Sequence, residues 1–171
     1  MATIAEKTVD SSEAHELGDE TFMSAEDLRA YMTKTAMAKA SKDIDAMDHA
    51  AKAREELVKT LSEPIDLTGE RLHEITTRLL GKLRTAAARG DTELLVMRFP
   101  SALCTDRGRK INNGIEGWPD TLVGKPRQAY DLWHDRLQPA GYRLKAMIVD
   151  WPGGMPGDVG FYLEWGDTKL N

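Results

Sequence analysis

Residues 142–165, YRLKAMIVDWPGGMPGDVGFYLEW, decide the fold of this chain. Apolar and polar side chains alternate over 142–150 and again over 159–165, which is typical of strands with one buried face. The segment between them, 151–158, is rich in Gly and Pro and is too short for a crossover connection. This stretch therefore predicts two antiparallel strands joined by a hairpin loop.

A further strand is predicted upstream of the hairpin. Residues 93–99 are apolar on both faces, which favours a central strand that is covered on both sides. A helix follows it along the chain, beginning near Lys125 with Pro126 at its first position and ending before Pro139. Because a helical crossover joins parallel neighbours with a right-handed connection, we expect a three-stranded mixed sheet.

Two helical regions precede the first strand. Residues 69–89 carry a broad apolar face, with Thr68 as a candidate cap and Gly90 as the residue that ends the helix. The order of elements is then α-β-α-β-β after a helical N-terminal arm. The sequence predicts the α+β class, with a small two-layer α/β domain over residues 67–171.

The helical arm is predicted over residues 23–63. Ser24 is a candidate N-cap, and Asp27 follows three residues later, as in a capping box. Small and apolar residues then recur at helical spacing, and Arg54 interrupts them. They are Leu28, Met32, Ala36, Ala40, Ile44, Met47, Ala51, Val58 and Leu61. One long helix and a helical hairpin broken at Ser41 both fit this pattern.

The charge of the chain is unevenly distributed. The formal net charge of −5 equals that of residues 1–22, which hold six acidic residues and one basic residue and are predicted to form a flexible tail. Residues 78–110 hold eight basic and three acidic residues. Such a segment favours nucleic acid or a phosphorylated ligand as a partner, although an ordinary charged surface gives the same composition.

Composition also excludes several classes of protein. The single cysteine, Cys104, forms no internal disulfide, and no segment resembles a signal peptide or a membrane span. We therefore expect a cytoplasmic protein without a membrane partner. The four histidines are scattered and lack metal-ligand spacing, so neither a metal nor another cofactor is expected.

Two loops are the strongest candidates for a binding site. The segment after the first strand contains Ser101, Arg107, Arg109 and Lys110, and a short helix is expected from Ser101 to about residue 111. The hairpin loop adds Trp151 and Met155 as an apolar wall. If the two strands that precede these loops run in parallel, both loops leave the same edge of the sheet. An anionic ligand with a flat or apolar end would suit such a surface.

Catalytic chemistry has little support in the sequence. Cys104 lies after a strand and near arginines, but the spacing of a phosphatase loop places Lys110 where an arginine is needed. A lone cysteine is more often a small buried apolar residue, so no catalytic residue is assigned. We predict a non-enzymatic interaction or regulatory protein, whose residues 24–62 bind a second copy or a protein partner. Binding of nucleic acid or phosphate through 78–110 is the alternative, and a cysteine-dependent enzyme is the least supported.

Overall fold

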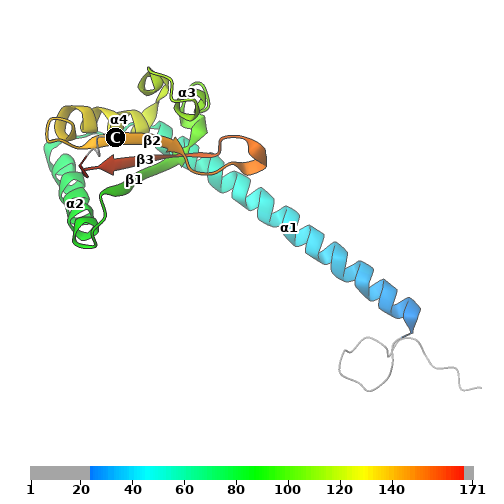
Figure 1. Ribbon diagram of the computed structural model, residues 1–171. Coiled ribbons are helices and arrows are strands. Elements are labelled where there is room, and N and C mark those ends of the chain that lie inside the picture. The colour runs from blue at the N-terminus through cyan, green and yellow to red at the C-terminus, as the bar shows by residue number, and fades with distance from the viewer. Residues whose placement is uncertain (1–23, 168–171) are drawn as a thin grey trace, which may run out of the picture. The chain divides into compact units, whose positions relative to one another are not determined.

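The computed structural model describes residues 24–167, so the acidic tail predicted for residues 1–22 lies outside the described residues. The helices and strands are α1 (Ala25–Ser62), α2 (Gly69–Ala88), β1 (Glu93–Pro100), α3 (Arg109–Asn112), α4 (Gly124–Leu132), β2 (Arg143–Ile148) and β3 (Asp158–Glu164) (Figure 1). This order, with its three-stranded sheet, confirms the predicted α+β class. The chain divides into two units between Ala51 and Lys52.

α1 is one uninterrupted helix, so the structure has the single helix and not the hairpin broken at Ser41. Its start is capped as predicted. The Asp27 amide donates to the Ser24 hydroxyl oxygen at 3.1 Å, and that hydroxyl donates to the Asp27 carboxylate at 2.6 Å. Residues 25–51 of the helix belong to the first unit and residues 52–62 to the second.

The sheet is antiparallel throughout, in the order β1-β3-β2. The predicted hairpin of β2 and β3 is confirmed, but the predicted mixed sheet is wrong. β1 and β2 run in the same direction, yet β3 lies between them and pairs with both. A helical connection fixes the relative direction of the two strands that it joins. It does not prevent a third strand from inserting between them, and here the hairpin places β3 there.

β1 is an edge strand, and not the central strand that its apolar run predicted. The pairing with β3 shifts register between Leu95 and Met97, as at a β-bulge. Because of this shift, the consecutive residues Val96 and Met97 both line the cavity on one face of the sheet. The apolar run therefore reflects an irregular strand with one covered face, whereas Leu95 is exposed.

The helix expected from Ser101 to about residue 111 is broken into separate pieces. A single 3-10 turn covers Ser101–Leu103, Cys104 then forms a β-bridge with Leu122, and α3 begins only at Arg109. Arg107 and Gly108 adopt left-handed backbone conformations, with φ of 57° and 80°. Two successive residues in this conformation end any right-handed helix, which explains the interruption.

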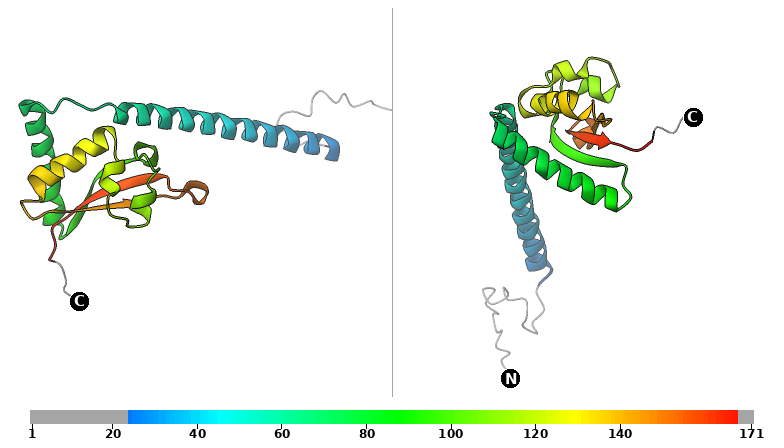
Figure 2. Two further views of the ribbon diagram at one scale, coloured as in Figure 1. Left: turned by 90° about the horizontal axis from the view of Figure 1, so that it is seen from above. Right: turned by 90° about the vertical axis from the view of Figure 1, so that its left-hand side faces the viewer.

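The core lies between one face of the sheet and the elements that follow β1. Its buried residues are Phe99, Leu103, Cys104, Ile111, Leu122, Ile148, Val159 and Phe161. Phe99 and Phe161 meet edge to face, with ring centroids 5.0 Å apart. α2 and α4 lie on the same side of the sheet (Figure 2), and side chains from both helices line one cavity with the sheet. Within residues 24–167, no helix of the second unit lines the opposite face, where Lys145 forms ion pairs with Glu93 and Glu164, so the domain has two layers.

The second unit begins within α1, at Lys52. Val58 and Leu61, from the last turns of α1, pack against the core. The connection to α2 is held by Gln128 of α4, whose side-chain amide donates to the Ile65 carbonyl at 2.7 Å and accepts from the Ile65 amide at 3.0 Å. These paired hydrogen bonds satisfy both backbone groups of Ile65.

Candidate functional site

The two candidate loops leave the sheet at the same end. Pro100 at the end of β1 pairs with Asp158, and Ile148 at the end of β2 pairs with Val159. The loops also touch, because the Ser101 amide donates to the Gly157 carbonyl at 2.9 Å and the Ser101 hydroxyl donates to the Pro156 carbonyl at 3.1 Å. The convergence expected from the sequence is therefore present. Ser101, however, is buried, and its polar atoms are used in holding the loops together.

Two backbone amides of the first loop are bound by a carboxylate of the chain itself. Arg107 and Arg109 are exposed, whereas Lys110 is half-buried. The carboxylate of Asp106 accepts hydrogen bonds from the Gly108 amide at 3.0 Å and the Lys110 amide at 2.8 Å. The chain's own carboxylate thus uses amides that a bound anion would need. Anion binding by this loop remains a prediction.

The apolar part of the expected site is exposed. Trp151 and Met155 flank the 3-10 turn Pro152–Gly154, and both side chains are exposed. Within residues 24–167, no hydrogen bond, ion pair or ring contact joins Trp151 or Met155 to the arginines of the first loop. The loops converge through hydrogen bonds of Ser101 to the backbone of the hairpin loop.

An ion-pair cluster that the sequence did not predict occupies this end of the sheet. Asp158 accepts a hydrogen bond from Arg98 at 2.8 Å and another from Arg54 at 2.9 Å. Asp150 lies 3.4 Å from Arg98 and also accepts a hydrogen bond from the Asp158 amide. Partial burial disfavours the charged carboxylate, but the hydrogen bonds from Arg98 and Arg54 outweigh it and lower the pKa of Asp158.

One signal in the sequence could have identified part of this cluster. Arg54 interrupts the apolar stripe of α1, and the alkyl stem of an arginine can lie along an apolar surface. A guanidinium on the face of a helix that packs against a core also needs an acidic partner. Asp158 is that partner, 104 residues away along the chain. Nothing in the local sequence of Arg54 or of Asp158 indicates that the two residues form a pair.

Cys104 is a buried core residue. Its side chain is inaccessible, and burial raises the pKa of the thiol to about 11. A thiol with this pKa is almost entirely protonated at neutral pH and is a poor nucleophile. The short helix expected from Ser101 would also have included Cys104, but the turn that begins there ends at Leu103.

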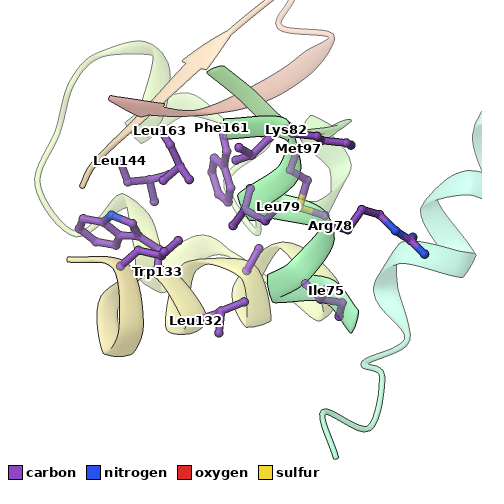
Figure 3. A pocket seen from close by; sticks show the side chains of 13 residues that line it. Ile75, Arg78, Leu79, Lys82, Met97, Leu132, Trp133, Leu144, Phe161 and Leu163 are labelled. Atoms are coloured by element: carbon purple, nitrogen blue, oxygen red, sulfur yellow. The ribbon is translucent and has the colours of Figure 1, made fainter. Parts of the chain in front are cut away.

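A cavity of about 250 Å³ lies between the sheet, α2 and α4. Its wall is apolar except for Arg78 and Lys82, both from α2 (Figure 3). Residues 78–82 belong to the basic segment noted in the sequence, but the cavity itself was not predicted. Its lining comes from α2, α4 and all three strands, so only the folded structure brings these residues together.

The first unit offers a different kind of surface. From Leu28 to Ala51, every side chain of α1 is exposed, including those of Met32, Ile44 and Met47. Single exposed apolar residues are ordinary on protein surfaces, and here several of them follow one another along one helix.

Within residues 24–167, no three His, Cys, Asp or Glu side chains gather as ligands for a metal ion. None of the helices in this part of the chain combines the length and the apolar character needed to cross a membrane. Comparison with protein-family models, with curated proteins and with solved structures finds no match for this chain.

Proposed function

We propose that this chain is a non-enzymatic interaction protein that associates with a second copy of itself through residues 25–51 of α1. The exposure of this helix segment carries the proposal. Met37, Ile44 and Met47 are 68%, 60% and 71% exposed. Helices in proteins gain most of their stability by packing an apolar face, and a second copy would supply that contact.

The spacing of the exposed residues supports a helix pair. Met37, Ala40, Ile44, Met47 and Ala51 follow one another at alternating intervals of three and four residues. This heptad spacing forms one apolar seam, the pattern that packs one helix against another. Two of the five residues are alanines, so the seam permits close approach but buries a modest area. We expect a reversible association that depends on concentration.

The charges of the segment favour a copy of the same helix as the partner. Its first half is basic, with Arg29, Lys34, Lys39 and Lys42, although Glu26 and Asp27 precede them. Its second half is acidic, with Asp43, Asp45 and Asp48. Two copies in antiparallel orientation would place the basic half of each helix beside the acidic half of the other. Such complementarity guides association and fixes the register.

Burial of Cys104 supports the non-enzymatic part of the proposal. Cys104 is the single cysteine of the chain, and its raised pKa of about 11 opposes formation of a nucleophilic thiolate.

Sedimentation equilibrium of the full chain tests the proposal. We expect a mass that rises with concentration towards twice the chain mass of 19.0 kDa. Met47→Asp places a charge in the seam and should shift the equilibrium to the single chain. Ala46→Asp is the matched control, because it adds the same charge one position away, outside the seam. A single-chain mass for the unmodified protein at its highest soluble concentration would exclude self-association.

A further inference from the structure

We propose that the cavity between the sheet, α2 and α4 binds a small carboxylate with an apolar tail, such as a short- or medium-chain fatty acid. The tail would lie among the apolar side chains, and the carboxylate would lie at the α2 side, near Arg78 and Lys82. This inference is independent of the self-association proposed for α1, since every residue that it uses belongs to the second unit.

The apolar wall of the cavity is contributed by every layer of the domain. Its residues are Ile75, Leu79, Val96, Met97, Ala129, Leu132, Trp133, Leu137, Leu144, Phe161 and Leu163. A cavity of roughly 150 Å³ in another protein is known to hold benzene, so 250 Å³ accommodates a somewhat larger guest. Long acyl chains exceed this volume, which restricts the tail to a short or medium length.

The two cations select an anionic group at the other end of the ligand. Arg78 and Lys82 lie one turn apart on α2, and Figure 3 shows both on the same side of the cavity, away from Trp133. Among residues 24–167, neither has a carboxylate at ion-pair distance, although Glu74 precedes Arg78 by one turn. Lys145, by contrast, is held by Glu93 at 2.6 Å and by Glu164 at 3.1 Å. Arg78 and Lys82 are therefore available to a ligand carboxylate.

An irregular helical turn shapes the wall opposite the cations. α4 continues into a π-helical turn, Trp133–Leu137, closed by a hydrogen bond of 2.8 Å from the Gln138 amide to the Trp133 carbonyl. Both end residues of this turn line the cavity. The Trp133 indole N–H donates to the Tyr142 carbonyl at 3.0 Å, which fixes the ring in place. Such π-helical turns occur frequently at functional sites.

NMR titration of the full chain with octanoate tests the site directly. The protein has four tryptophans, so the indole N–H signals are few, and a Trp133→Phe variant identifies that of Trp133. We expect octanoate to shift the Trp133 signal in a saturable manner. Octanol and octylamine share its tail and differ in charge, and we expect both to bind about five- to tenfold more weakly.

Two kinds of variant separate the tail site from the charge site. Ala129→Phe fills the cavity and should abolish octanoate binding, with thermal unfolding as a check that the domain remains folded. Arg78→Gln with Lys82→Gln removes two exposed charges and should bring octanoate affinity down to that of octanol. Arg84→Gln, on the same helix but outside the lining, is the matched control and should leave binding unchanged.

Three results would each overturn the proposal. The first is a Trp133 signal that none of the three ligands moves. The second is octanoate affinity that persists in a folded Ala129→Phe variant, because the ligand would then bind elsewhere. The third is equal affinity for octanoate and octanol, together with an octanoate affinity that the loss of Arg78 and Lys82 does not change. The cavity would then accept any apolar ligand.

Discussion

Arg54 of α1 donates a hydrogen bond of 2.9 Å to Asp158 at the first position of β3, across 104 residues of sequence. The same guanidinium donates to the Gly157 carbonyl at 3.1 Å. These contacts attach the C-terminal part of α1 to the hairpin loop, and Val58 and Leu61 extend the attachment into the core. They explain why the second unit begins at Lys52, inside α1, and not after Ser62, where the helix ends.

Replacement of Asp158 should destabilise the second unit. Asp158→Asn keeps the shape of the side chain but removes the charge that Arg54 and Arg98 share. Asp158 is only 15% exposed, so we expect a loss of about 1–2 kcal/mol in the free energy of unfolding. Urea unfolding followed by tryptophan fluorescence measures this loss, because all four tryptophans lie in the second unit.

A surface ion pair provides the control for that experiment. Arg89 and Asp91 also form a hydrogen-bonded pair, at 3.0 Å, but both side chains are largely exposed. Asp91→Asn should therefore change the free energy of unfolding by less than about 0.5 kcal/mol. Equal losses for the two substitutions would mean that the ion pairs of Asp158 contribute no more to stability than an exposed surface pair.

The stability contributed by Asp158 should disappear in acid. Its pKa is lowered in the folded chain, so the unfolded chain takes up a proton first as the pH falls. The contribution is complete above the unfolded value of about 3.9 and is lost as the pH falls from there through the folded pKa. Urea midpoints of the unmodified chain and of Asp158→Asn should therefore converge below about pH 4. A constant difference between them down to the lowest pH measured would contradict this assignment.

Gly124 should not tolerate any side chain. Its φ is 62°, and a Cβ at this position would collide with the carbonyl oxygen of Leu61 at the end of α1. Gly124→Ala should therefore cost more than the roughly 1–3 kcal/mol expected from backbone strain alone. Gly90→Ala is the control, because Gly90 has a φ of 88° but open space around it. Urea unfolding should show the larger loss for Gly124, and equal losses would mean that the close approach to α1 is unimportant.

Cys104 should react with thiol reagents only when the chain unfolds. The thiol is buried, and its pKa of about 11 leaves almost no thiolate at neutral pH. We expect modification by a disulfide reagent to be many times slower in the native protein than in urea. Rates measured by absorbance in both conditions test this, and rapid modification without denaturant would contradict the burial of Cys104.

The parts of the fold that depend on local sequence could be predicted. The capping pair Ser24 and Asp27, the stop at Gly90 and the alternation in both hairpin strands each rest on residues close together in the chain. The sheet order could not be predicted in the same way. Whether β3 lies between β1 and β2 depends on contacts between strands about 60 residues apart, and the local pattern of β1 gives no information on them.

In the candidate site, too, the features that depend on local sequence could be predicted and those that depend on the folded structure could not. Side-chain types indicated a basic loop and an apolar loop, and strand direction correctly placed both at one end of the sheet. The use of the Gly108 and Lys110 amides by Asp106 was not predicted, because it depends on the left-handed conformation of Arg107. The cavity was also missed, since no single segment supplies more than a few of its residues.

The orientation of the proposed helix pair can be deduced from the residues that flank the seam. In an antiparallel pair centred on residue 42, Met37 of one copy faces Met47 of the other, and Ala40 faces Ile44. This alignment also places Lys34 beside Asp48 of the other copy, twice in each dimer. A parallel pair in register would instead place Arg29 beside Lys34 and Asp43 beside Asp48, so that like charges meet.

Single charge reversals should therefore distinguish the two orientations. Lys34→Asp or Asp48→Lys alone creates two like-charge contacts in an antiparallel dimer and should raise its dissociation constant by about three- to tenfold at low salt. The double variant restores opposite charges and should return the constant close to that of the unmodified chain. In a parallel dimer each single variant would instead turn two like-charge contacts into opposite-charge contacts and strengthen association. Sedimentation equilibrium of the four proteins separates these outcomes, and tighter association of either single variant would exclude the antiparallel arrangement.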